Sequence, residues 1–170
     1  MKYLLSLIAL MCTGPVMLVA QVNQASTEAR KEITRLGFIV GEWKGNGWIM
    51  DRNGEQHEFT QSEEVQFKLD STVILVEGVG KTEENIIHNA LGIISYNPED
   101  RNYTFRSYLS SGLSNTFTGE LKGDVFYWYP GENMRYVVRI NEEDQWVEKG
   151  EMNRGENWIP FLEMTLDKAE

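Results

Sequence analysis

The ten residues 41–50, with the sequence GEWKGNGWIM, constrain the fold most. Helical spacing of apolar residues ends before this stretch and strand spacing begins within it. Alternation puts Trp43, Gly45, Gly47 and Ile49 on one face. That face carries one large ring and then two positions without side chains, where a neighbouring strand or a ligand can approach closely. The stretch is typical of the first strand of a closed β-barrel, with Trp43 as the floor below a cavity.

Turn residues recur about every eight to twelve residues after this strand, which is the spacing of an antiparallel barrel or sandwich. Short links favour neighbour-to-neighbour order, and such a meander has two open edges unless it closes. We therefore predict an all-β fold, an antiparallel ten-stranded up-and-down barrel with a short N-terminal helix. The further strands are predicted at residues 57–69, 73–81, 86–96, 103–109, 113–121, 125–129, 134–140, 145–151 and 158–168.

A short helix is predicted immediately before the first strand, over residues 26–36. Ala29, Ile33 and Leu36 have helical spacing, Ser26 is placed to cap the N-terminus, and Gly37 ends the helix. A helix in this position is expected to cover one end of the barrel.

Residues 1–20 have the layout of a secretory signal peptide. Lys2 precedes an apolar stretch at residues 3–11, and the segment ends with a plausible cleavage site after Ala20. Cleavage there predicts a secreted or periplasmic protein.

Two other interpretations of this segment fit less well. A retained membrane anchor is disfavoured because Gly14 and Pro15 interrupt the apolar stretch and no basic stop-transfer cluster follows. Lipidation of Cys12 is disfavoured because Met11 occupies a position that needs a small residue. Cys12 is the only cysteine, so the mature chain is expected to lack disulfides, zinc-thiolate sites and cysteine nucleophiles.

The charge balance argues against nucleic acid as a partner. The chain has 16 Lys and Arg against 26 Asp and Glu, a formal net charge of −10. An acidic protein without a basic cluster repels phosphate backbones and anionic lipid surfaces. We expect no nucleic-acid partner, and no membrane association after signal cleavage.

The second predicted strand has an unusual inner face. Gln61 and Glu63 interrupt an otherwise apolar face that holds Phe59, Val65, Phe67 and Leu69. Burying two such polar groups without partners is costly. A polar patch within an apolar lining is typical of a ligand pocket.

The remaining polar candidates are two histidines and two arginines. His57 lies beside a turn and is expected to be solvated, whereas His88 shares a face with apolar residues. His88 is either a hydrogen-bonded interior histidine or a metal or heme ligand. Arg106 and Arg139 lie in the middle of strands and are expected to face the lumen. Residues 51–55 resemble the start of a calcium loop, but an Asn-Gly hairpin turn explains them better.

Several carboxylates share faces with apolar residues, namely Glu63, Glu77, Glu148 and Glu163. They form either an acid/base pair for catalysis or a structural lattice of salt bridges. The sequence leaves both interpretations open.

Three segments carry a family resemblance: LGFIVGEWKGNG at residues 36–47, LGIISYNP at 91–98 and WIPFLEMTL at 158–166. They resemble bacterial lipocalin-like domains of unknown function in the calycin superfamily, which are distantly related to nitrobindin-type heme-binding barrels. The resemblance implies a ten-stranded calycin barrel. Nitrobindin-like heme binding uses a histidine near the C-terminal end of the barrel, and here no histidine follows His88. We therefore expect no cofactor, and heme is disfavoured.

The resulting domain prediction is a signal peptide at 1–20, a flexible tail at 21–25 and one lipocalin-like barrel domain at 26–170. The leading functional hypothesis is non-covalent binding of a small hydrophobic or amphipathic molecule, without catalytic or metal-binding residues. The alternatives are an isomerase or hydrolase that uses interior carboxylates, and a structural or interaction protein with a filled barrel. The predicted ligand-binding residues are Trp43, Gln61, Glu63, His88, Arg106 and Arg139.

Overall fold

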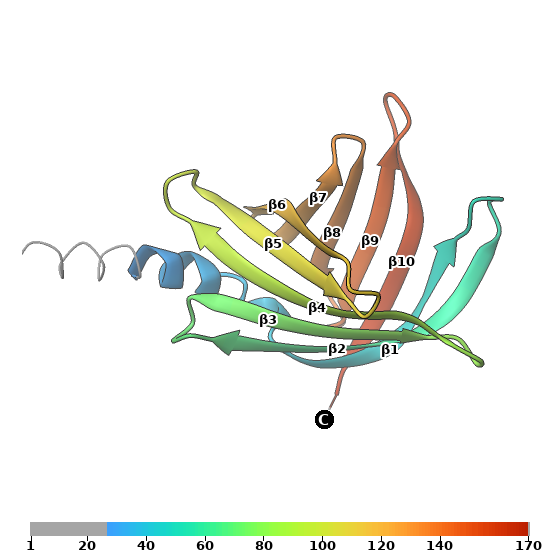
Figure 1. The fold of residues 1–170 in the computed structure, drawn as a ribbon, viewed down its shortest axis with the longest axis horizontal. Helices are drawn as coiled ribbons and strands as arrows, with labels where there is room; N and C mark the ends of the chain where they lie inside the picture. The colour runs from blue at the N-terminus through green and yellow to red at the C-terminus, as the bar shows by residue number, and fades with distance from the viewer. Residues whose placement is uncertain (1–26, 170) are drawn as a thin grey trace, which may run out of the picture.

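A computed structural model of the chain describes residues 27–169. The predicted signal peptide and tail, Cys12 and the Ser26 cap lie outside these residues. Within them, no helix is both long and apolar enough to cross a membrane. The strands, shown in Figure 1, are β1 (Gly41–Met50), β2 (Gln56–Lys68), β3 (Val73–Lys81), β4 (Ile86–Asn97), β5 (Asn102–Leu109), β6 (Ser114–Lys122), β7 (Val125–Gly131), β8 (Met134–Ile140), β9 (Trp146–Asn153) and β10 (Trp158–Lys168).

The strands form a closed antiparallel barrel in which each strand pairs with its neighbours in sequence. Closure comes from β1, which pairs with β2 on one side and with β10 on the other. Trp43 on β1 thus lies opposite Glu63 of β2 and opposite Lys168 of β10. The predicted fold class, a ten-stranded up-and-down barrel with a short N-terminal helix, is confirmed.

Closure depends on the small residues of β1. A Cβ atom added to Gly45 would lie 2.2 Å from the carbonyl oxygen of Thr165 and 2.8 Å from Cα of Leu166. Both contacts are with the backbone of β10, so a side chain at this position has no room. The absence of a side chain at Gly45 lets the two closing strands approach each other.

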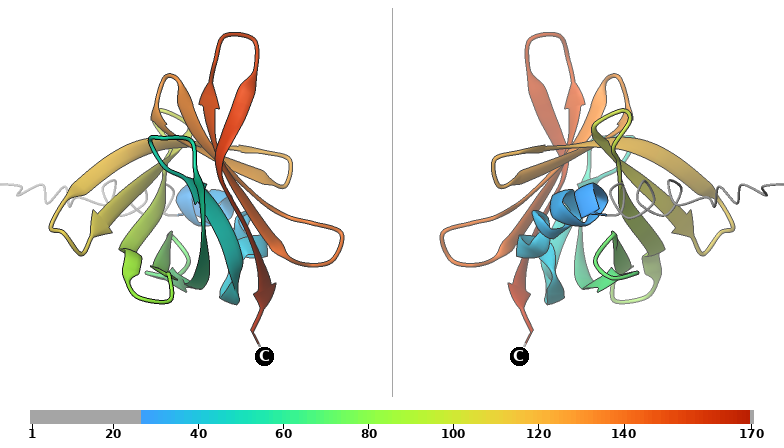
Figure 2. Two further views of the ribbon diagram at one scale, coloured as in Figure 1. Left: turned by 90° about the vertical axis from the view of Figure 1, so that its right-hand side faces the viewer. Right: turned by 90° about the vertical axis from the view of Figure 1, so that its left-hand side faces the viewer.

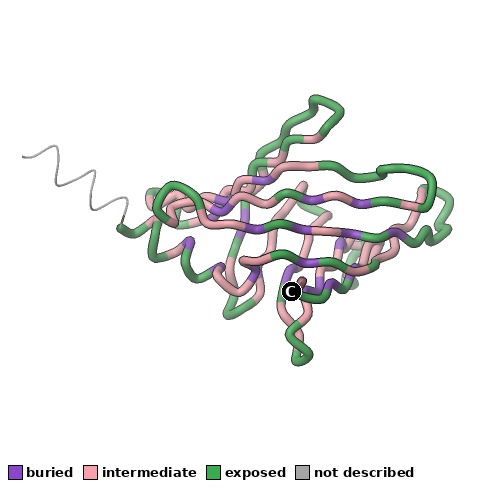
Figure 3. Tube along the Cα trace, turned by 90° about the horizontal axis from the view of Figure 1, so that it is seen from below, coloured by how far each residue is buried: buried purple, intermediate pink, exposed green. Residues whose placement is uncertain are grey.

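Burial alternates along the strands, as Figure 3 shows for the barrel wall. On β2 the side chains of Phe59, Gln61, Glu63 and Val65 are buried, while those between them are exposed or half-buried. The prediction that Leu69 continues this face is wrong. Leu69 lies in the turn after β2 with a φ of 48° and is 75% exposed.

A helix covers one end of the barrel, as Figure 2 shows. Residues 27–34 are α-helical and are followed by the 3-10 helix η1 (Gly37–Ile39). Ile33, Leu36 and Ile39 are each at most 1% exposed, because they point into the barrel end. The hydroxyl of Tyr103 donates a hydrogen bond to the carbonyl oxygen of Glu32 at 3.0 Å and ties the helix to β5.

Trp43 joins the helix to the barrel floor. Its indole Nε1–H donates to the carbonyl oxygen of Ile39 at 2.9 Å, and the side chain is 2% exposed. Its ring meets that of Trp146 edge to face, with 5.9 Å between the ring centroids. These contacts close the barrel end and define the lower boundary of the lumen.

Candidate functional site

A cavity of about 250 Å³ lies inside the barrel. Its wall is mainly apolar and aromatic, because the inward positions of nearly every strand carry such residues. The main apolar contributors are Phe59, Val76, Ile94, Phe105, Trp128 and Val138.

A small set of polar side chains enters this apolar wall. Gln61 and Glu63 come from β2, His88 from β4, Tyr136 from β8 and Glu148 from β9. None of the described lining residues is lysine or arginine. The lumen therefore contains two carboxyl groups and no strongly basic partner.

Glu63 is buried, with 7% of its surface exposed. Gln61 donates from Nε2 to Glu63 Oε1 at 2.6 Å. On β3 the residue opposite is Gly78, where a Cβ atom would lie 2.7 Å from Glu63 Oε2, so the glycine makes room for the carboxyl group. Burial raises the pKa of Glu63 to about 7, and the hydrogen bond from Gln61 offsets part of this effect.

Glu148 is the second interior carboxyl group. Its Oε2 accepts a hydrogen bond from the indole Nε1–H of Trp146 at 3.3 Å. Burial raises the pKa of Glu148 to about 8, and the negative charge of Glu63 adds to the increase. The carboxyl groups of Glu63 and Glu148 line the same cavity, and with these pKa values the pair retains at least part of a proton at neutral pH.

Aromatic rings form one wall of the cavity. Trp128 and Tyr136 stack with 4.0 Å between centroids and 5° between planes, and Phe105 meets Trp128 edge to face at 4.9 Å. Burial raises the pKa of the Tyr136 phenol, which therefore stays neutral at physiological pH. The wall offers flat apolar surface beside the carboxyl groups.

His88 lies at the accessible side of the cavity, on the same stretch of β4 as Ile87, which is 47% exposed. His88 is itself exposed, yet desolvation of its ring lowers its pKa. Its imidazole is therefore mainly neutral at pH 7.

The structure separates the predicted site residues into three groups. Gln61, Glu63 and His88 line the cavity, and Trp43 lies beneath it without lining it. The expectation that Arg106 and Arg139 face the lumen is wrong, because both are exposed on the outer face.

Strand alternation explains the misplaced arginines. Phe105 and Ser107 line the cavity, so Arg106 between them must point outward, where it donates from Nε to Thr116 Oγ1 at 3.2 Å. Val138 faces the cavity, and Arg139 therefore points away from it.

The other candidate carboxylates lie outside the cavity. Glu77 is exposed, and Glu163 forms an ion pair with Lys149 at 2.9 Å. The salt-bridge interpretation thus applies to Glu163. Glu63 and Glu148 form no ion pair with any described residue.

The predicted ligand-binding residues omitted Ser107, Trp128, Tyr136 and Glu148, which all line the cavity. Glu148 follows Trp146 by two residues on β9, and residues two apart on a strand point to the same face. The sequence therefore already contained the signal that the two side chains lie together. The same argument from Phe105 would have placed Ser107 inside.

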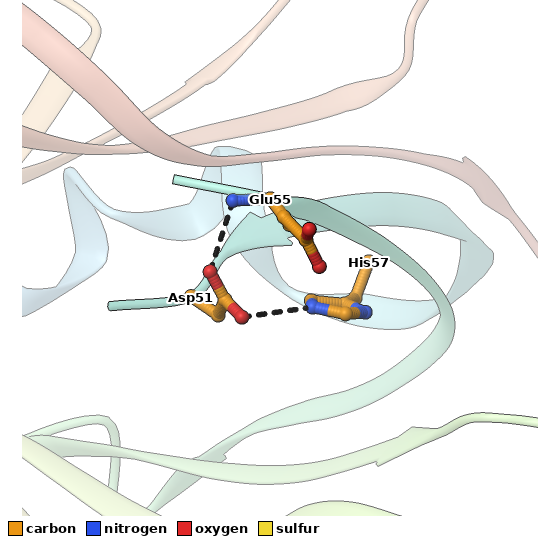
Figure 4. Close-up of side chains that lie close together, drawn as sticks. All are labelled: Asp51, Glu55 and His57. Atoms are coloured by element: carbon orange, nitrogen blue, oxygen red, sulfur yellow. Dashed lines mark hydrogen bonds and ion pairs between the residues drawn. The ribbon is translucent and has the colours of Figure 1, made fainter. Parts of the chain in front are cut away.

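The first hairpin contains a separate group of possible metal ligands, shown in Figure 4. Asp51 Oδ1 accepts the backbone N–H groups of Asn53 at 2.8 Å and Glu55 at 2.9 Å, and Oδ2 lies 3.3 Å from His57 Nε2. The backbone hydrogen bond from Glu55 is the main cause of the lowered pKa of Asp51. These bonds organise the turn between β1 and β2, in agreement with the hairpin interpretation.

Comparison with known proteins identifies a shared fold. No protein-family model and no curated protein matches the chain. The crystal structure of Rv2717c from M. tuberculosis has a TM-score of 0.59 and 14% sequence identity, covering 84% of this chain and 98% of that one. The S-type phycobiliprotein lyase CPES from Guillardia theta has a TM-score of 0.41 and 10% identity, covering 85% and 97%. The similarity to Rv2717c shows a common barrel fold, and the similarity to the lyase is too low to support an argument.

Proposed function

We propose that the protein is a secreted or periplasmic barrel that binds a small, partly apolar molecule non-covalently in its lumen. The observation that carries this proposal is the cavity of about 250 Å³ inside the barrel. Ligand sites are concave and mostly apolar, with a few polar groups that fix orientation. The aromatic wall and the side chains of Gln61, Glu63 and Glu148 match that composition.

The same cavity counts against a barrel filled by its own side chains. Gly78 and Gly92 both line the lumen, and each makes room for an interior side chain, Glu63 and Phe105 respectively. At Gly92 an added Cβ would lie 2.3 Å from the Phe105 ring, so this glycine is needed to seat the ring. The cavity of about 250 Å³ thus persists although the interior side chains pack closely against each other.

Binding is tested with 2-phenylethanol, a neutral probe with one ring and one polar group. Ligand-observed NMR is expected to show saturable binding to the full chain. Ala90 lines the cavity, so Ala90→Phe should fill the space and abolish binding. Asn89→Phe is the matched control, since Asn89 is the exposed neighbour on the same strand. Equal binding by both variants would place the probe outside the lumen and contradict the proposal.

The export of the protein is part of the proposal and rests on the signal-peptide layout of residues 1–20. The distant relationship to nitrobindin-type barrels is also proposed, and it rests on the three sequence segments described above. Expression in a bacterium with a periplasm is expected to yield a mature chain that begins at Gln21. Intact-mass measurement of the periplasmic fraction tests this, and retention of residues 1–20 would contradict it.

The second candidate function is an isomerase that uses the interior carboxyl groups. One observation favours it: Glu63 and Glu148 have pKa values near neutrality and lie beside free space, without a basic partner. Such groups are suited to proton transfer. A carboxylate would remove a proton from C2 of 3-cyclohexen-1-one, and a carboxyl group would return one at C4 to give the conjugated enone. Ultraviolet absorbance measures the product, and an equal rate in Glu63→Gln and Glu148→Gln variants would contradict this role.

A further inference from the structure

The ionisable groups that line the lumen favour negative over positive charge. The titratable side chains that line the cavity are Glu63 from β2, His88 from β4, Tyr136 from β8 and Glu148 from β9. Tyr136 stays neutral because burial raises its pKa, and His88 is mainly neutral because desolvation lowers its pKa. Among the described residues, the lumen thus has two groups that can become negative and none that carries a stable positive charge.

Glu63 has unused hydrogen-bonding capacity. Gln61 donates from Nε2 to Oε1, and the Glu63 side chain is only 7% exposed. A carboxylate accepts several hydrogen bonds, so the group has room for a further donor from a ligand or water. Because Glu63 lines the cavity, a ligand in the lumen can supply that donor.

The two carboxyl groups select the charge of the ligand. A ligand anion would add negative charge to a poorly hydrated space that already disfavours ionisation of the two carboxyl groups, and a neutral ligand would leave that ionisation uncompensated. An ammonium group carries a positive charge and up to three N–H donors, and so favours the ionised form of the carboxyl groups that line the cavity.

The aromatic wall and the size of the cavity define the rest of the ligand. A volume of about 250 Å³ is the volume that about eight water molecules occupy in the liquid. This admits one ring or a short chain. Phe105 and Trp128 provide apolar faces for it, and aromatic rings also attract a nearby cation.

We propose that the ligand is a small amphipathic amine, bound as its ammonium ion by Glu63 and Glu148, with its apolar part against Phe105 and Trp128. This inference rests on the proposed binding function and adds the chemical class of the ligand. A metal ion is a poorer fit, because Asp51, Glu55 and His57 are the only described trio whose ligand atoms lie within 4.8 Å of one another, and they lie on the β1–β2 hairpin.

The test compares three probes of nearly equal size: 2-phenylethylamine, 2-phenylethanol and phenylacetate. Calorimetry near pH 8 is expected to show that the amine binds about tenfold or more tightly than the alcohol, since hydrogen bonds between charged groups are the stronger ones. Phenylacetate is expected to bind most weakly. Glu63→Gln and Glu148→Gln should each reduce the preference for the amine while preserving binding of the alcohol. Glu77→Gln, a change at an exposed carboxylate on β3, should alter neither.

Proton release gives a second readout. Binding of the ammonium ion requires ionised carboxyl groups, so the affinity for the amine should rise as the pH increases through the two pKa values, about 7 and about 8. At pH 7, titrations in two buffers of different ionisation enthalpy should show proton release on amine binding and none on alcohol binding. Glu148→Gln should reduce that release.

The possible outcomes distinguish an error in the proposed ligand class from an error in the proposed binding function. If the alcohol or phenylacetate binds as tightly as the amine, the proposed ligand class is wrong while the lumen remains a binding site. If none of the three probes binds, both the ligand class and the binding function are contradicted. Amine preference that persists in both glutamine variants would also overturn the assignment of Glu63 and Glu148.

Discussion

Glu63 and Glu148 hold most of the polar character of the interior. Gln61 donates to Glu63, and the indole groups of Trp146 and Trp128 donate to Glu148. None of these donors is charged, so burial dominates and both pKa values rise. The folded protein therefore binds protons that the unfolded chain has already lost.

This difference predicts a pH-dependent stability. The ordinary glutamate pKa is 4.5, and the folded values are about 7 and about 8. The stabilising effect is complete below the unfolded value and is lost as pH rises through the folded values, by on the order of 1 kcal/mol per pH unit. Urea denaturation between pH 5 and pH 8 should show this decline, and Glu148→Gln should flatten it. Glu77→Gln should retain the full slope, and an unchanged slope in Glu148→Gln would contradict the explanation.

Trp43 is expected to contribute to stability rather than to ligand contact. Trp43→Ala removes a buried ring together with its hydrogen bond to Ile39 and its contact with Trp146, so the free energy of unfolding should fall by about 3–5 kcal/mol. Trp48→Ala, on the half-buried outer face of the same strand, should cost less. Chemical denaturation measures both, and a small change for Trp43→Ala would mean that Trp43 does not support the floor.

The site could be predicted only in part from single residues. The interruption of an apolar face by Gln61 and Glu63 was sufficient to place both inside. Arg139 was misplaced because Tyr136, Val137 and Val138 are consecutive apolar residues, which hide the alternation of β8. The proximity of Glu148 to Glu63 depends on barrel closure, since β9 and β2 are far apart in sequence and are not paired.

At the scale of elements, the strands were the most predictable part of the chain. Turn residues such as Asn53 and Gly54 bound each strand, and the predicted strand ends agree with the structure to within one or two residues. The end of β2 shows the limit of this approach. Leu69 continues the alternation in sequence, yet Leu69, Asp70 and Ser71 all adopt positive φ angles in the turn.

The junction of β1 and β10 is expected to be intolerant of side chains at Gly45. In Gly45→Ala the new Cβ would meet backbone atoms of Thr165 and Leu166, which cannot move as a side chain can. The expected loss of stability is about 1–3 kcal/mol or more. Gly131→Ala is the control, because nothing lies within 4 Å of the added atom. Equal denaturation midpoints for the two variants would show that the strands at this junction can separate without cost.

At the scale of the whole molecule, the cavity is small relative to the barrel that encloses it. Its volume of about 250 Å³ falls below the range of about 300–1,000 Å³ typical for drug-sized ligands. The helix and the Trp43 layer occupy one end of the barrel, and the aromatic wall occupies part of the remainder.

These dimensions support the prediction that the protein does not bind heme. His88 is the one histidine on the cavity wall among the described residues, and a porphyrin is larger than the available space. Added hemin is expected to give no saturable Soret shift at micromolar concentration. A stoichiometric shift that disappears in His88→Ala would contradict this prediction and identify His88 as the axial ligand.

The pairing of β1 with β10 also has a consequence for the order of folding. Trp43 lies opposite Lys168, so the contact that closes the barrel joins the beginning of the sheet to its last strand. On the ribosome, β1 emerges long before its second partner and cannot complete its hydrogen bonds until synthesis is almost finished. Contacts between such distant segments slow folding. The barrel can therefore close only after β10 has been synthesised.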